Sequence, residues 1–166
     1  MILALGMVAG VVLLFQYGLP FFRAPRLSDS QKQWKEYSRD APPGHPLEVV
    51  AHGYRMIRAY RKEVAPGSGA PPRDLNLVEW EWKILVRNRT LQDREVFANY
   101  YLVDENRLMV DADALILQKP VPSGETVTIL HQTDMVYEDS FRVAGGVWEI
   151  FWEEGKTLRK VRREGF

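Results

Sequence analysis

The chain has 166 residues, which is enough for one small domain with a single core and one additional segment. Its 22 basic and 22 acidic residues cancel, so the overall charge provides no general attraction to nucleic acid. The absence of cysteine excludes disulfide bonds, thiolate metal sites and cysteine nucleophiles, although it does not indicate a compartment.

Residues 1–22 predict a transmembrane helix. Residues 2–22 carry no charged side chain, and Gln16 is the only strongly polar one. At a rise of about 1.5 Å per residue they span roughly 30 Å, the thickness of a hydrocarbon core. A cleaved signal peptide is the alternative, but nothing basic precedes the run and FFRAP follows it without a small-residue cleavage site. We therefore expect an uncleaved, single-pass helix in the cell (inner) membrane.

Small and aromatic residues of this segment predict two kinds of contact. Gly6 and Gly10 form a GxxxG pair, a weak motif for close packing against another membrane helix. Tyr17, Phe21 and Phe22 lie near the end of the run, where interfacial aromatic side chains are expected. We expect the first pair to contact another helix and the aromatic residues to lie at the membrane surface.

The charges around the predicted helix indicate its orientation. Only the α-amino group precedes it, whereas five basic residues follow: Arg23, Arg26, Lys32, Lys35 and Arg39. The positive-inside rule therefore favours a cytoplasmic soluble domain, with the periplasmic side as the alternative. Arg23 and Arg26 are expected at the lipid–water interface.

Residues 23–64 predict a helical region beside the membrane. Its first helix is expected over residues 28–40, where Ser28 and Gln31 have the spacing of a capping box. Trp34 would then lie at headgroup level if this helix is interfacial. A simple packed connector is the alternative.

A second helix is predicted over residues 46–64, with Pro46 at its first position. An approximate apolar stripe supports it, formed by Leu47, Val50, Tyr54, Ile57 and Val64. Gly53 weakens this prediction, and a first strand over residues 54–60 is the alternative. The Pro/Gly-rich residues 65–74 predict a linker.

From residue 75 onward the periodicity changes to two. Apolar residues alternate with charged ones at Val78, Trp80, Trp82, Ile84 and Val86. This alternation is typical of a strand with one buried and one wet face. Further short strands separated by turns predict an antiparallel β-sandwich over residues 75–155 and a mainly β chain. Residues 156–166 predict a basic C-terminal tail.

Short motifs within residues 82–150 resemble the FxLYD type of bacterial immunoglobulin-like domain. Asn88 ends a predicted strand. The segments YYLVD and PSGET supply Tyr100, Leu102, Asp104, Pro122, Gly124 and Glu125. Val103 replaces the family's second aromatic residue, and Asn106-Arg107 stands where glycine is usual. The likeness covers a little under half of the chain.

The resemblance implies an immunoglobulin-like sandwich of a kind that is commonly membrane-tethered and has no known catalytic centre. It carries over no active-site residues. From the residues themselves, we expect Tyr100 and Leu102 to point into the core. Asp104 is expected to cap a hairpin by accepting backbone N–H bonds.

The sequence offers few groups for chemistry. The three histidines, His45, His52 and His131, lack the spacing of a metal site. Asp111 and Asp113 share one face of a predicted strand, with Asp104 as a third candidate. Such a cluster can bind Ca²⁺ or serve acid–base catalysis, but an exposed polar face is the expected arrangement. We expect no catalytic, metal or cofactor site.

Tryptophan side chains are the largest apolar groups in the predicted sandwich. Trp80 and Trp82 share a strand face, as do Trp148 and Trp152, and we expect all four to fill the core. A surface aromatic platform for a glycan or a protein is the alternative. Phe151 would lie on the opposite face, so we expect a partner surface there with basic residues Arg159, Lys160, Arg162 and Arg163.

These observations predict a non-catalytic accessory subunit that stabilises a larger integral membrane complex through its helix and its β-sandwich. Bacterial respiratory and photosynthetic assemblies are the candidate complexes. The expected partners are the lipid bilayer and other subunits, not nucleic acid. The alternative is a membrane-tethered assembly factor or a ligand- or glycan-binding module. A hydrolase that uses the aspartates is a third, weaker hypothesis.

Overall fold

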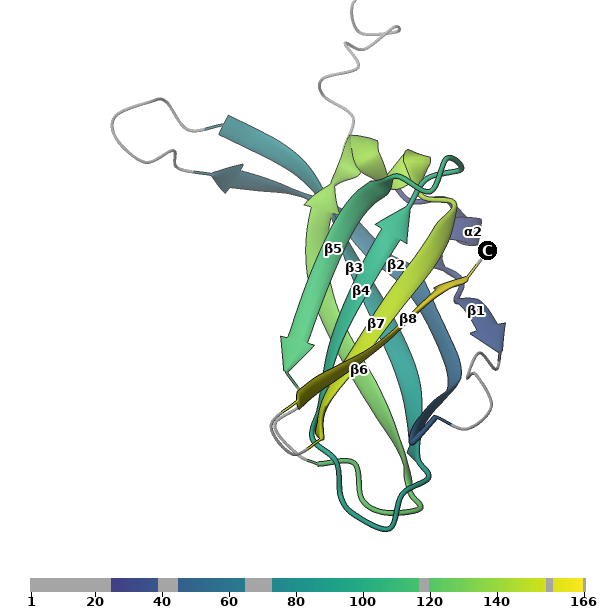
Figure 1. Ribbon diagram of the computed structural model, residues 1–166. Helices are drawn as coiled ribbons and strands as arrows, with labels where there is room; N and C mark the ends of the chain where they lie inside the picture. Colours follow the sequence, from purple (N-terminus) through teal and green to yellow (C-terminus); the bar gives the residue numbers. More distant parts are fainter. Residues whose placement is uncertain (1–24, 39–44, 65–72, 117–119, 155–156, 166) are drawn as a thin grey trace, which may run out of the picture.

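The protein's structure, a computed structural model, describes residues 25–38, 45–64, 73–116, 120–154 and 157–165. These residues form two four-stranded antiparallel sheets, with two short helical segments towards one end (Figure 1). The predicted mainly β fold and antiparallel sandwich are therefore confirmed. The predicted transmembrane helix over residues 1–22 lies outside the described residues. Within the described ranges, no helix has the length and apolar character needed to cross a bilayer.

The first sheet has the strand order β1-β2-β3-β6 and the second has the order β5-β4-β7-β8. The strands of the first sheet are β1 (Lys35–Ser38), β2 (Leu47–Val64), β3 (Arg73–Asn88) and β6 (Thr126–Val136). Those of the second are β4 (Val96–Val103), β5 (Met109–Ile116), β7 (Gly145–Glu154) and β8 (Thr157–Gly165). The helical segments are α2 (Asp29–Lys32) and the 3₁₀ helix η2 (Tyr137–Arg142).

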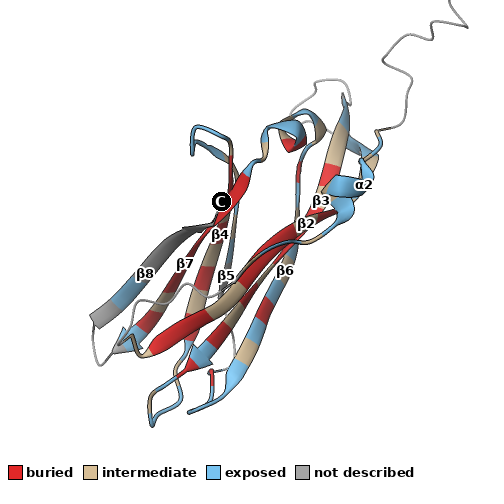
Figure 2. Cartoon of the chain, turned by 90° about the vertical axis from the view of Figure 1, so that its right-hand side faces the viewer, coloured by how far each residue is buried: buried red, intermediate tan, exposed pale blue. Residues whose placement is uncertain are grey.

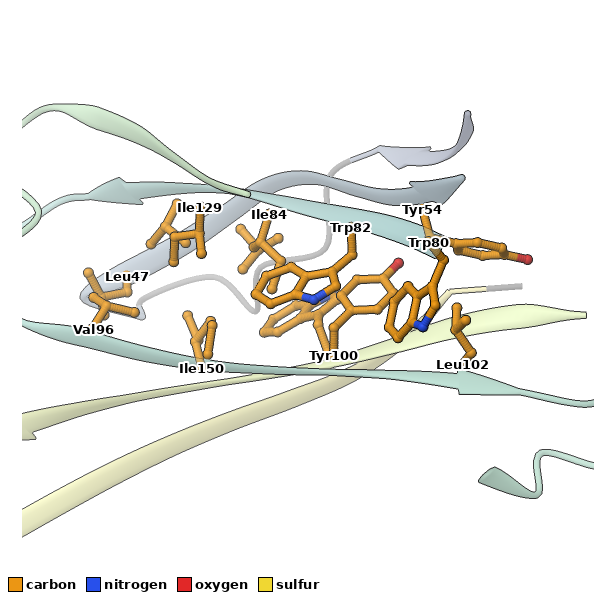
Figure 3. Packing of buried hydrophobic residues seen from close by; sticks show 14 of the residues in the cluster. Leu47, Tyr54, Trp80, Trp82, Ile84, Val96, Tyr100, Leu102, Ile129 and Ile150 are labelled. Carbon is orange, nitrogen blue, oxygen red and sulfur yellow. The ribbon is translucent and has the colours of Figure 1, made fainter. Parts of the chain in front are cut away.

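The core lies between the sheets and is rich in aromatic residues (Figures 2 and 3). Trp80, Trp82 and Ile84 alternate along β3 and are fully buried. Tyr100 reaches them from β4, and its ring stacks on Trp82 with 5.5 Å between ring centroids. Each fully buried large apolar side chain contributes about 1.5–3 kcal/mol to the free energy of unfolding. Leu102 is also fully buried, so the predicted inward direction of Tyr100 and Leu102 is confirmed.

The predicted helix over residues 46–64 is wrong, because Leu47–Val64 forms β2. The alternative strand over residues 54–60 is confirmed and is longer than expected. β2 pairs with β3 but has register shifts between Val49 and Ala51 and between Met56 and Arg58. The extra residues, Val50 and Ile57, shift the two-residue alternation. They also belong to the stripe that resembled a helix, so the bulges explain the error.

The predicted helix over residues 28–40 is mostly wrong. Its capping box is present, with Ser28 and Gln31 bonded to each other's backbone, but α2 ends at Lys32. The following residues form β1 on the edge of β2, where Glu36 lies opposite Gly53. A Cβ atom on Gly53 would lie 2.6 Å from the Lys35 carbonyl oxygen, so glycine permits this close approach. Pairing with β2 therefore overrides the local preference for helix.

The predicted boundaries of the sandwich change at both ends. The basic tail over residues 156–166 is mainly strand β8, which pairs with β7. Basic side chains are common on edge strands, because they hinder the addition of a further strand. The sandwich therefore extends from Lys35 to Gly165 rather than over residues 75–155. Most of the predicted linker lies outside the described residues, and its last two residues, Arg73 and Asp74, belong to β3.

The β2–β3 arm, residues 61–64 and 73–76, extends beyond the two sheets. These residues pair with each other, whereas β6 pairs with β3 only from Leu77 onward and β1 pairs with β2 only as far as Tyr54. The arm leaves the body at the end where η2 lies (Figure 1). Its two strands therefore have no third strand beside them in the described part of the chain.

Candidate functional site

Two aspartates form a ladder of hydrogen bonds with the core tryptophans. Asp111 Oδ2 accepts the indole N–H of Trp80 at 2.8 Å, and Asp113 Oδ2 accepts that of Trp82 at 2.7 Å. The carboxylates lie on β5 and the indoles on β3, so this indole–carboxylate ladder joins the two sheets. The expectation of an exposed polar face is wrong. The buried indole N–H groups need acceptors, and that requirement directs both carboxylates inward.

His131 of β6 completes the polar edge between β5 and β6. Its Nδ1 atom lies 2.5 Å from Asp113 Oδ2. Burial raises the pKa of the Asp111 carboxyl group, and the bond from Trp80 partly opposes that effect. Asp113 Oδ2 contacts both the indole and the imidazole, and Asp113 Oδ1 accepts the backbone N–H of Ala114 at 3.0 Å. Its bonds stabilise the fold and leave this carboxylate little freedom to act as a base.

Asp104 lies at the β4–β5 turn and does not belong to this ladder. Its Oδ1 atom accepts the backbone N–H groups of Asn106 and Leu108, each at 2.9 Å. The predicted hairpin cap is therefore confirmed. Its Oδ2 atom lies 3.6 Å from Arg142 Nη2, which connects the turn to η2. The three aspartates proposed for a hydrolase thus occupy two separate places, and each has a local structural role.

His52 is buried on β2 among aromatic rings. Its Nδ1 atom forms a 3.0 Å hydrogen bond with the Tyr100 hydroxyl, and its ring stacks on Tyr37 at 4.9 Å. Burial lowers the pKa of His52 to about 4. The imidazole is therefore neutral at physiological pH, and its Nε2 atom has no hydrogen-bond partner.

The other histidines lie apart from His52. His45 packs edge-on against Trp152, with 5.6 Å between ring centroids, and His131 belongs to the indole–carboxylate ladder. Among the described residues, no three side chains of His, Asp or Glu are grouped as metal ligands would be. The three histidines therefore lie in three separate local environments.

All four tryptophans of the sandwich lie in the core. Trp80, Trp82, Trp148 and Trp152 are buried, which confirms the core interpretation and contradicts the surface platform. The indole N–H groups of Trp148 and Trp152 are buried without an acceptor, unlike those in the ladder. The sandwich therefore presents none of these rings to a glycan.

The predicted partner surface lies on β7 and β8. Phe151 is half-buried, and Lys160 Nζ lies 5.2 Å from its ring centroid. Lys160 also forms a 2.6 Å ion pair with Glu149. Arg159 is exposed, and the backbones of Arg162 and Arg163 lie opposite Glu149 and Trp148. The structure places this set on two adjacent strands, β7 and the edge strand β8, and its role in binding a partner stays a prediction.

The predicted interfacial residues have different outcomes. Trp34 lies beneath two cations of the sheet, with 4.9 Å from Arg55 Cζ and 4.2 Å from Lys83 Nζ to its ring centroid. These contacts favour the packed-connector alternative for the segment around Trp34. Arg26 is exposed near η2. The remaining predicted contacts lie outside the described residues: Gly6, Gly10, Tyr17, Phe21, Phe22 and Arg23.

The sequence reasoning missed an apolar surface at the η2 end of the sandwich. Leu108 and Met109 follow the β4–β5 turn and are 62% and 63% exposed, and Phe141 of η2 is 63% exposed. We call these three residues the apolar end. An open hollow beside it is lined by residues of the turn and of η2. The only sequence signal is a pair of apolar residues, Leu108-Met109, directly after a hairpin turn.

Comparisons with known proteins find distant likenesses in structure. No family model and no curated protein matches the chain. A β-glucuronidase from glycoside hydrolase family 2 is similar over 64% of this chain, with a TM-score of 0.36 and 9% identity. The match spans 10% of the glucuronidase chain. A conserved hypothetical protein from Bacillus anthracis has a TM-score of 0.27 and 17% identity, with 77% and 96% of the two chains covered. Both TM-scores are too low for either likeness to bear on function.

Proposed function

We propose that the chain is a membrane-anchored, non-catalytic accessory subunit that stabilises a larger integral membrane complex. Residues 1–22 anchor it in the cell membrane, and the sandwich works beside the bilayer. The cytoplasmic side is favoured by the basic residues after the anchor. Respiratory and photosynthetic assemblies are the candidate complexes. The apolar length of residues 2–22 supports the anchor.

The sandwich is proposed to be an immunoglobulin-like domain of the FxLYD type. The pairing of β4 with β7 and of β7 with β8 opposite a β2-β3-β6 sheet agrees with such a topology. Tyr100 and Leu102 are buried and Asp104 caps the β4–β5 turn, as the residues of YYLVD lead one to expect, and we take these positions as support for the resemblance. The resemblance implies a membrane-tethered domain without a catalytic centre, which suits an accessory subunit.

The observation that carries the proposal is the β2–β3 arm. A two-stranded ribbon alone is marginally stable in water, and its unpaired N–H and C=O groups favour contact with another chain. Within the arm, Arg61 and Asp74 form a 2.6 Å ion pair between the strands. At its base, Arg58 and Glu79 form another at 2.5 Å. These exposed pairs align the strands but add little free energy, so a neighbouring subunit is the expected source of further stabilisation.

A transient assembly factor would use the same anchor and arm. The two functions differ in stoichiometry, because a subunit stays with the finished complex and a factor leaves it. Isolation of the tagged chain from membranes in mild detergent separates them. We predict stoichiometric companions that persist in the mature complex.

The arm allows a direct test, since Tyr60 and Leu77 lie opposite each other at its base. Replacing residues 61–76 by Asn-Gly closes the shortened hairpin with a two-residue turn. We predict that the variant folds but recovers at least about tenfold less companion protein, which corresponds to about 1.4 kcal/mol of binding free energy. Leu91→Ser, at an exposed position on the opposite end, is the control and retains the companions. Isolation of the intact chain alone would contradict the proposal.

A further inference from the structure

We infer that the η2 end of the sandwich lies against the lipid bilayer, with the apolar end (Leu108, Met109 and Phe141) in contact with lipid. This inference rests on the proposed membrane anchor. It adds the orientation of the domain and the residues that contact lipid. The occupant of the apolar end is therefore the boundary between headgroups and acyl chains rather than a second protein.

The first argument is the length of chain between the apolar run and the sandwich. Only three residues lie between Phe22 and Arg26, so the four Cα–Cα steps of an extended chain span at most about 14 Å. The Arg26 backbone is held by η2, because the Tyr137 hydroxyl donates to the Arg26 carbonyl oxygen at 2.8 Å. The Arg26 N–H donates back to the same hydroxyl at 3.4 Å. If residues 2–22 span the bilayer, η2 is tethered close to the headgroup region, which is about 5–8 Å thick on each side.

The second argument is the direction of the exposed apolar residues. Phe141 packs edge-on against Tyr137 with 5.0 Å between ring centroids, so it lies next to the tethered point. Leu108 and Met109 follow the β4–β5 turn directly. This turn is connected to η2 by the ion pair of Asp104 Oδ2 with Arg142 Nη2 at 3.6 Å. Both segments lie at one end of the molecule (Figure 1). Single exposed apolar residues are ordinary, but three at the end that receives the anchor favour lipid contact.

The third argument concerns charge. Arg142 is paired with Asp104 and Asp139. Basic Arg26 and Arg107 and acidic Glu105 and Glu138 are exposed nearby. This balance provides no strong attraction to anionic lipid. Burial of apolar side chains therefore supplies the main free energy of contact, and zwitterionic phosphatidylcholine is a sufficient partner. Salt is expected to have little effect on the contact.

The opposite end of the sandwich provides a matched control. Leu91 lies in the connection between β3 and β4 and is 96% exposed. It is apolar like the residues of the apolar end, and it is more accessible than they are. The eight residues of β4 separate this connection from the β4–β5 turn. At about 3.3 Å per residue they place Leu91 roughly 25 Å or more from the apolar end.

The absence of cysteine makes a site-specific experiment possible. The variants Phe141→Cys, Leu108→Cys and Leu91→Cys of the full chain are labelled with a fluorophore. They are reconstituted in phosphatidylcholine nanodiscs that contain nitroxide-labelled phosphatidylcholine. We predict at least about twofold stronger quenching at positions 141 and 108 than at 91, because the first two labels lie in the interface. Met109→Cys replaces any variant whose thermal unfolding shows that it does not fold.

The outcomes separate this inference from the proposed function. Equal, weak quenching at 141, 108 and 91 in chains that co-elute with nanodiscs would overturn the lipid contact. The anchor would stand, and the apolar end would belong to a protein interface. A chain that does not co-elute with nanodiscs would overturn both proposals. Quenching at the η2 end alone, unchanged at high salt, supports the inference.

Discussion

His52 occupies a position where burial controls protonation. Its ring lies between Tyr37 and the hydroxyl of Tyr100, and its pKa is lowered to about 4 from the ordinary value of 6.5. The unfolded chain therefore takes up a proton at a higher pH than the folded chain does. The neutral histidine is favourable at neutral pH and becomes a source of instability in acid.

We predict that His52 makes the sandwich acid-sensitive between about pH 6.5 and pH 4. Its contribution is complete above the unfolded pKa and is lost as the pH falls towards the folded pKa. The loss is about 2–3 kcal/mol in the free energy of unfolding. Urea unfolding at neutral and acidic pH measures it, with His52→Gln as a control that removes this titration. An identical pH dependence in both chains would contradict the assignment.

The sequence predicted some residue roles well and others poorly. The two-residue alternation placed Trp80, Trp82 and Tyr100 in the core, where burial of the largest apolar groups dominates. Asp104 was predictable because a short acidic side chain at a turn accepts backbone N–H bonds. The inward direction of Asp111 could not be predicted. The two-residue alternation shows which residues share a face of a strand, but it does not show which face is buried.

At the scale of elements, the indole–carboxylate ladder links the two sheets at the side of the sandwich where β5 and β6 lie. β5 and β6 are edge strands of different sheets, and Asp111, Asp113 and His131 lie on the side of these strands that meets the core tryptophans. Inward charges on edge strands disfavour the addition of a further strand. The ladder therefore combines a link between the sheets with protection of their edges.

We predict that Asp113→Ala lowers the free energy of unfolding by about 1–3 kcal/mol, because the buried Trp82 N–H loses its acceptor. Asp113→Asn is expected to lose less, since an amide oxygen can still accept this bond. Glu125→Ala, at an exposed turn position, is the control and stays within about 0.5 kcal/mol. Chemical denaturation measures all three. Equal stability of Asp113→Ala and the control would show that the ladder is dispensable.

The helices that were wrongly predicted have a common cause, because strand pairing in the folded sheet overrides the local sequence pattern. Val50 and Ile57 produced a helical spacing because each is the extra residue of a bulge. Gly53 weakened the predicted helix and also permits β1 to approach, so it was the one local signal for the correct fold. The regular strand β3 has no such shift against β6, and its apolar face was predicted correctly over residues 78–86. Its charged face is not wholly wet, because Glu81 is buried and bonded to Arg55 and Gln132.

At the scale of the whole molecule, three features lie at one end. The described chain begins near there at residue 25, with Arg26 bonded to η2. The β2–β3 arm projects there, and the apolar end is exposed there (Figure 1). An anchored domain with this arrangement would hold its arm near the membrane surface, where neighbouring subunits present their water-exposed parts. The sequence predicted the anchor, but the grouping of these features depends on the fold.

The membrane anchor is the claim on which the rest depends, and alkaline extraction of membranes tests it most directly. The intact chain is expressed beside a Leu13→Arg/Leu14→Arg variant, in which each arginine at the centre of the span adds about 2.5–3.5 kcal/mol to the cost of insertion. We predict that the intact chain stays in the membrane pellet after a carbonate wash and that the variant is released. Release of the intact chain into the wash would contradict the account.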